Sequence, residues 1–248
     1  MGTDAVLVKT IAFFRGAVTI SLFLLFGAGA LLLSALMPIL RTPRRCQPLV
    51  RATWIPFAAL MRLAGIVGVE RGNLSPELRG CVIAANHPSL IDVVLVTALV
   101  PRTLYVAKPA LLRNPFMASI VRHTSLPADE RLPEAVSGYL CEGWNVLVFP
   151  EGTRSPAEGG LGEFRRGVAQ LILRTGAPLV CLGIGVTQRI LAKGQKPWCV
   201  GAKRVVYSFR ADGPTRHVAA RPSALRPDAI RLTAEIRRRI EDLVAGKA

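Results

Sequence analysis

The sequence predicts an α/β domain in which a mixed sheet has flanking helices, preceded by an N-terminal helical segment embedded in a membrane. Three patterns predict this fold class. They are a long charge-free apolar run near the N-terminus, short β-branched runs that then alternate with helical periodicity, and an amphipathic stretch at the end. We place the membrane-anchoring helices in residues 1–65 and the α/β domain in residues 66–248. A chain of 248 residues has room for both parts.

The first apolar run extends from Gly16 to Leu40 and lies between Arg15 and Arg41. At about 1.5 Å of rise per residue, a helix of this length can cross the hydrocarbon core of a bilayer. A second apolar stretch, residues 49–69, follows it. Two arrangements fit these runs: a spanning helix followed by an interfacial helix, or a two-helix hairpin that enters a single leaflet.

Composition and charge indicate what the chain contacts. Apolar residues make up 51% of it, the mean hydropathy is +0.38 and the formal net charge is +16 at pH 7. A basic excess attracts nucleic acid or the anionic membrane surface. Because the sequence has no zinc-finger, RNP-like or basic-heptad pattern, we expect the membrane surface as partner and no nucleic acid. More arginines follow the apolar run than precede it, so the positive-inside rule predicts an inner-membrane protein whose α/β domain faces the cytoplasm.

Cysteine and histidine patterns point away from metal and disulfide chemistry. The five cysteines include no C-x-x-C pair, and three scattered histidines make a His/Cys cluster hard to assemble. We therefore expect free thiols in a reducing compartment, no metal site and no redox cofactor.

From about residue 66 the chain alternates between two kinds of element. The expected strands are residues 81–85, 104–107, 145–149 and 179–186, with 205–209 as a further one. The expected helices are residues 90–99, 113–122, 133–142, 164–174 and 226–244. This alternation predicts a partly parallel sheet, and ligands of such sheets gather at the carboxyl ends of strands. Polar groups follow three strands, at residues 86–92, at Lys108 and at residues 150–155, so we expect a site there.

The first of these strand ends leads into residues 86–92, Asn-His-Pro-Ser-Leu-Ile-Asp. Asp92 can bind one ring nitrogen of His87, fix its tautomer and leave the other nitrogen as a base near neutral pH. This is the logic of a catalytic triad in which the substrate supplies the hydroxyl nucleophile. Taken alone, the pair also fits a structural hydrogen bond. We expect Ser89 to be the N-cap of the helix that carries Asp92.

The third strand end leads into residues 149–155, Phe-Pro-Glu-Gly-Thr-Arg-Ser. Arginine recognises phosphate through two parallel hydrogen bonds, and glycine lets the backbone approach an anion closely. Glu151 could accept a hydrogen bond from an acceptor hydroxyl or orient Arg154. A charged turn closed by an internal Glu–Arg pair is the alternative.

Together, and in this order, the two blocks resemble the glycerolipid acyltransferase family typified by 1-acyl-sn-glycerol-3-phosphate acyltransferases. Residues 86–92 match the family motif N-H-x4-D, and residues 149–155 match F-P-E-G-T-R-S residue for residue. The resemblance covers roughly residues 65–185. It implies that His87 is the general base and Asp92 its orienting partner.

The same resemblance implies how substrates bind. The residues expected to hold the acceptor phosphate are Glu151, Gly152, Thr153, Arg154 and Lys108. The implied donor is acyl-CoA or acyl carrier protein, used as a co-substrate with no cofactor. The implied acceptor is the free hydroxyl of a lysophospholipid, with 1-acyl-glycerol-3-phosphate giving phosphatidate in phospholipid biosynthesis.

Two departures from the family pattern concern the identity of the acceptor. Ala110 stands where a polar residue is usual, and Cys181 replaces a proline of a later block. An O-acyltransferase for another lipid, such as a lyso-ornithine lipid or a polyene or pigment lipid, is therefore an alternative, as is a non-catalytic basic membrane-binding protein. A lipid hydrolase is disfavoured because the sequence has no G-x-S-x-G elbow.

Overall fold

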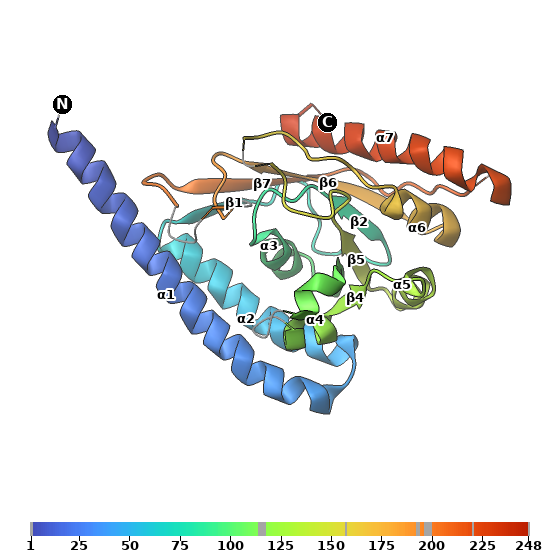
Figure 1. The fold of residues 1–248 in the computed structure, drawn as a ribbon, viewed down its shortest axis with the longest axis horizontal. Helices are drawn as coiled ribbons and strands as arrows, with labels where there is room; N and C mark the ends of the chain where they lie inside the picture. Colours follow the sequence, from blue (N-terminus) through green and yellow to red (C-terminus); the bar gives the residue numbers. More distant parts are fainter. Residues whose placement is uncertain are drawn as a thin grey trace.

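The computed structural model describes residues 2–113, 118–156, 158–191, 194–195, 200–219 and 221–247. Two long helices, α1 (Gly2–Leu40) and α2 (Pro43–Leu63), precede the sheet, and α1 runs along the outer side of α2 (Figure 1). Within the described residues, Val6–Leu40 of α1 is the segment long and apolar enough to cross a membrane, with a mean hydropathy of 2.3. Pro43 begins α2, where its missing N–H costs nothing because the first turn has no acceptor for it.

Helix α2 packs on both α1 and the sheet domain. Its Phe57 makes edge-to-face contacts with Phe23 and Phe26 of α1, at ring-centroid distances of 5.3 Å and 5.1 Å. The same Phe57 belongs to the hydrophobic core under the sheet. Arg15 of α1 donates to the carbonyl of Gly65 at 2.8 Å, just after α2 ends. These contacts join the helical pair to the start of the α/β domain.

The described residues form a seven-stranded sheet in the order β1-β7-β6-β2-β5-β3-β4. The strands are β1 (Val67–Glu70), β2 (Val82–Ala85), β3 (Thr103–Ala107), β4 (Ser125–Pro127), β5 (Asn145–Val148), β6 (Leu179–Val186) and β7 (Val205–Ala211). All neighbouring strands are parallel except β6 and β7, which are antiparallel. The predicted mixed sheet is thus confirmed. Strands β1 and β4 were not predicted. Strand β1 overlaps the end of the apolar stretch over residues 49–69, so it gives no separate signal, and β4 has only three residues.

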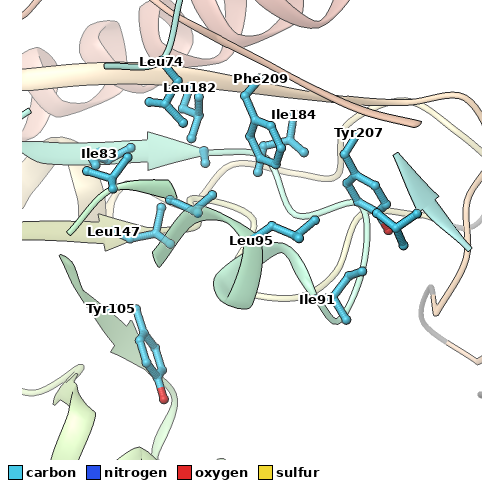
Figure 2. Close-up of a cluster of buried hydrophobic side chains, with 14 of the residues drawn as sticks. Leu74, Ile83, Ile91, Leu95, Tyr105, Leu147, Leu182, Ile184, Tyr207 and Phe209 are labelled. Carbon is cyan, nitrogen blue, oxygen red and sulfur yellow. The ribbon is translucent and has the colours of Figure 1, made fainter. Parts of the chain in front are cut away.

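Helices cover both faces of this sheet. Helices α6 (Gly167–Thr175) and α7 (Leu225–Ala245) lie on one face, and α2 and α3 (Asp92–Leu99) lie on the other (Figure 1). Strand β2 shows why both faces are apolar: Ile83 and Ala85 belong to the core beside α2 and α3, while Val82 and Ala84 belong to the core beside α6 and α7. Figure 2 shows the first core, in which Ile83, Leu95 and Leu147 lie together.

The remaining helices are short. They are α4 (Ala118–Thr124), α5 (Leu132–Cys141) and the 3₁₀ helices Pro109–Arg113 and Pro222–Ala224. The helix expected over residues 113–122 falls partly outside the described residues, and α4 is its described part. The helix expected from Phe164 begins only at Gly167, and the Arg165 N–H before it donates to the Pro150 carbonyl at 2.9 Å.

Candidate active site

The carboxyl ends of three neighbouring strands meet at one edge of the sheet. Strands β2, β5 and β3 lie side by side and are mutually parallel. They end at Ala85, Val148 and Ala107, directly before the segments that carry the expected polar residues. Parallel strands place these segments at the same edge, where ligands of α/β sheets bind.

His87 and Asp92 are in direct contact at this edge. The His87 Nδ1 atom lies 2.9 Å from Asp92 Oδ2, and the Asp92 side chain is fully buried while the His87 side chain is 16% exposed. Asp92 is the first residue of α3, so the helix fixes its direction. With Nδ1–H held by the carboxylate, Nε2 is the ring nitrogen able to take a proton from a substrate.

Ser89 forms hydrogen bonds with the Asp92 carboxylate and does not cap the helix. Its backbone N–H donates to Asp92 Oδ2 at 2.8 Å, and its hydroxyl donates to Oδ1 at 2.5 Å. The expectation that Ser89 is the N-cap of α3 was therefore wrong: the N-cap position belongs to Ile91. The Ser89 hydroxyl donates to the Asp92 carboxylate, whereas the oxygen of an N-cap side chain accepts a backbone N–H from the first turn of the helix.

Two aromatic residues complete the surroundings of the pair. The Phe149 ring stacks on the His87 ring, with centroids 4.1 Å apart and planes inclined by 17°, which restricts rotation of the imidazole. Tyr207 of β7 is fully buried, and its hydroxyl has no hydrogen-bond partner among the described residues. Burial and, to a smaller extent, the charge of Asp92 raise the pKa of Tyr207, so its phenol stays neutral.

Glu151 joins the second block to the first. Its Oε1 accepts the His87 backbone N–H at 3.0 Å and the Ser155 hydroxyl at 2.7 Å, and its Oε2 accepts the Gly162 N–H at 2.6 Å. The Ser155 N–H donates back to the His87 carbonyl at 2.8 Å. Glu151 is 3% exposed. These three bonds hold Glu151 inside the protein, where it braces the turn, and the phosphate-binding role expected for it stays a prediction.

Gly152 lies beneath two basic side chains. Its φ of +60° is a left-handed conformation that favours glycine. A Cβ built on it lies 3.5 Å from Lys108 Cε and 3.5 Å from Arg165 Cδ, so both cationic side chains pass over the turn. Lys108 and Arg165 are both exposed. The structure thus brings Lys108 to the turn, as expected. It also brings Arg165 there, a residue that was not predicted for the site because it was assigned to the helix expected over residues 164–174.

The other two residues of the turn differ in exposure. Thr153 is exposed. Arg154 is part-buried and its Nη1 donates to the Leu191 carbonyl at 2.7 Å. The same carbonyl accepts the Leu90 N–H at 3.3 Å, so Leu191 links the turn to the segment between His87 and Asp92.

A buried carboxylate contacts the histidine, and the exposed side chains of Lys108 and Arg165 pass over the neighbouring turn. An arrangement of this kind can supply a general base beside a site for an anion. Among the described residues, no group of three or more His, Cys, Asp or Glu side chains is placed to hold a metal ion.

The chain is similar in sequence to several known proteins. Residues 66–185 match the family described as Acyltransferase. A 1-acyl-sn-glycerol-3-phosphate acyltransferase of Pseudomonas aeruginosa is 30% identical over 177 residues, which is 65% of this chain and 68% of that protein. One of Cocos nucifera is 28% identical over 109 residues, 40% of this chain. The chain matches only 35% of the length of that plant relative.

The fold also has a solved counterpart. The crystal structure of the 1-acyl-sn-glycerophosphate (LPA) acyltransferase PlsC from Thermotoga maritima superposes with a TM-score of 0.61. The superposition covers 96% of this chain and 97% of that one, at 22% sequence identity. At this identity the likeness concerns the fold, including its helical N-terminal part.

Proposed function

Because this chain belongs to the acyltransferase family, we propose that it transfers a fatty acyl group from acyl-CoA or acyl carrier protein to the free hydroxyl of a lysophospholipid. The proposed acceptor is 1-acyl-glycerol-3-phosphate and the product is phosphatidate. One observation carries the proposal: the His87–Asp92 pair is joined through Glu151 to a turn over which Lys108 and Arg165 extend. A base for a hydroxyl thus lies beside cations for a phosphate.

His87 acts as the general base in this mechanism. Its Nε2 takes the proton of the acceptor hydroxyl while the oxygen attacks the thioester carbonyl. The tetrahedral intermediate collapses, the C–S bond breaks, and the imidazolium returns the proton to the leaving thiolate. Asp92 stabilises the imidazolium that forms in between, and a general base of this kind contributes about 10²- to 10⁴-fold to the rate.

Lys108 and Arg165 hold the acceptor phosphate in this proposal, with Thr153 exposed on the same turn. Arginine can bind a phosphate through two parallel hydrogen bonds, and lysine adds a point charge. Glu151 and Arg154 then act as supports of the turn, since their polar atoms bond to His87 and to Leu191. This division of roles refines the one that the sequence resemblance implied.

The enzyme works at a membrane in this proposal. Helices α1 and α2 carry many exposed apolar side chains, among them Phe13, Phe14, Leu24, Leu25, Leu32, Leu36, Ile39 and Leu63. Arg15 and Phe57 join these helices to the α/β domain, which favours a hairpin in one leaflet over a helix that leaves the domain. We further propose that the α/β domain lies on the cytoplasmic side of the inner membrane, which the arginines that follow the apolar run support.

An acylation assay tests the proposal. Purified protein in vesicles is given acyl-CoA or acyl carrier protein loaded with a fatty acyl group. The acceptors are lysophosphatidate, lysophosphatidylcholine, monoacylglycerol and lyso-ornithine lipid, and mass spectrometry measures the products. We expect acylation of lysophosphatidate, its loss in His87→Ala, and unchanged vesicle binding by that variant. Acylation of phosphate-free acceptors alone would overturn the proposed acceptor. Undiminished turnover in His87→Ala would favour the non-catalytic membrane-binding protein.

A further inference from the structure

The C-terminal helix α7 contacts the loop that follows residues 151–154, the turn over which Lys108 and Arg165 extend and which we call the phosphate turn. Arg237 Nη1 donates to the Gly162 carbonyl at 2.7 Å. Its guanidinium carbon also lies 5.5 Å from the centre of the Phe164 ring, within the range of a cation–π contact. Arg237 lies beyond residues 66–185, the segment that matches the family. A residue of the C-terminal helix therefore contacts the loop beside the phosphate turn.

Gly162 connects this arginine to Glu151. While its carbonyl accepts from Arg237, its N–H donates to Glu151 Oε2 at 2.6 Å. A Cβ at position 162 would lie 2.7 Å from the same Oε2 atom, so the carboxylate can approach this closely only because the residue is glycine. The two backbone groups of Gly162 thus lie in a chain of contacts from α7 to the turn.

The chain of contacts continues to both functional parts of the site. Glu151 accepts the His87 backbone N–H through its other oxygen. Phe164, which Arg237 covers, is buried and directly precedes Arg165. The Arg165 N–H donates to the Pro150 carbonyl, so the loop is held at both ends. Motion of residues 162–164 would displace the carboxylate beneath His87 and the side chain that passes over Gly152.

We infer that Arg237 is a positioning residue: by holding Gly162 and Phe164 from α7, it sets where Arg165 meets the acceptor phosphate. The kinetic consequence of this inference rests on the proposed function, whereas the contact between Arg237 and the loop does not depend on it. Arg237 touches no reacting atom in this scheme. It acts through the loop, and its loss reduces acceptor binding more than the chemical step.

Arg237→Met tests the inference, because methionine keeps an apolar stem over Phe164 and removes every donor to Gly162. Arg238→Met is the matched control, since Arg238 is an exposed residue of the same helix with the same charge. We expect Arg237→Met to raise KM for lysophosphatidate about ten-fold, the effect of losing one charge-assisted hydrogen bond. The kcat value should change little, and Arg238→Met should behave as the parent. Arg237→Lys, which keeps a donor, should restore most of the affinity and serves where the methionine variant folds poorly.

Hydrogen exchange of residues 158–166 measures the contact without substrate. We expect faster exchange in Arg237→Met than in Arg238→Met, with equal thermal melting of the two. Equal exchange and equal KM in both variants would overturn the inference. If the parent protein acylated no acceptor, the proposed function would fail while faster loop exchange would still support the positioning contact.

Discussion

The Glu151 carboxylate accepts the backbone N–H of His87 at 3.0 Å, although 64 positions separate the two residues in the chain. With the Ser155 N–H bonded to the His87 carbonyl, this contact makes the base and the phosphate turn parts of one hydrogen-bonded unit. Any displacement of the turn is therefore transmitted to the backbone that carries the imidazole.

Replacing Glu151 with glutamine should destabilise the fold as well as the site. The glutamine amide presents a donor where three donors converge, leaving at least one of them unsatisfied at a cost of about 1–3 kcal/mol. We expect a lower melting temperature in detergent and reduced kcat/KM. Glu163→Gln, an exposed neighbour with the same charge change, is the control and should match the parent. Equal melting of the two variants would show that the carboxylate is not needed as an acceptor.

Asp92→Asn should reduce kcat by about 10²- to 10⁴-fold while the protein stays folded. The asparagine amide cannot accept all three bonds from His87 and Ser89, so the imidazole loses its fixed tautomer. Ser89→Ala should give a smaller loss, since it removes one of the two Ser89 bonds. Steady-state kinetics with lysophosphatidate measure both effects. A kcat near that of the parent in Asp92→Asn would exclude the orienting role.

Lys108→Met and Arg165→Met should each raise KM for phosphate-bearing acceptors by about ten-fold or more, because each removes a charged contact to phosphate. Arg166→Met, a change of the next residue, which is also exposed, is the control. The two test variants should lose little activity toward monoacylglycerol, if that lipid is acylated at all. A KM for lysophosphatidate that neither variant changes would place the phosphate elsewhere.

Two glycines of the site should respond differently to alanine. At Gly152 the new Cβ has ordinary contact distances of 3.5 Å, so Gly152→Ala costs only the strain of a left-handed backbone, about 1–2 kcal/mol. At Gly162 the Cβ would meet Glu151 Oε2 at 2.7 Å, so the carboxylate or the loop must move. We expect Gly162→Ala to lower kcat/KM more than Gly152→Ala. Melting temperatures and kinetics of both variants check this order, and the reverse order would contradict it.

The protein should lose stability as pH rises from about 9 to 12. Burial raises the pKa of the Cys81 and Cys181 thiols and of the Tyr105 phenol to about 12, from ordinary values of 9.0 and 10.0. In this range the unfolded chain has released protons that the native state still holds. The free energy of unfolding therefore falls with pH, by up to about 1.4 kcal/mol per unit for each group.

Two cysteine variants separate the contribution of a buried thiol from other causes of alkaline unfolding. Cys181→Ala should flatten the dependence of unfolding free energy on pH between 9 and 12, whereas Cys141→Ala, at an exposed position, should leave it unchanged. Chemical denaturation at a series of pH values measures both slopes. Identical slopes in the two variants would mean that the buried Cys181 thiol does not contribute.

Local sequence patterns were sufficient for the fold class. The runs Val82–Ala85 and Asn145–Val148 are strands with both faces buried. Such continuous apolar runs can be predicted from the sequence without knowing which strands pair with them. Three polar segments placed after parallel strands also predicted where a site would form. The strand Val67–Glu70 was missed because it overlaps the end of the apolar stretch over residues 49–69, and Ser125–Pro127 was missed because it has only three residues.

Patterns along the chain thus predicted the mixed α/β fold, the apolar N-terminal helix and the contact between His87 and Asp92, which are five positions apart. They did not predict which buried polar groups pair in the folded protein. The Ser89 hydroxyl donates to Asp92, Glu151 is buried, the Arg165 side chain passes over Gly152, and Arg237 donates to Gly162. Periodicity depends on neighbours in sequence, whereas a buried donor bonds to whichever acceptor folding brings within reach.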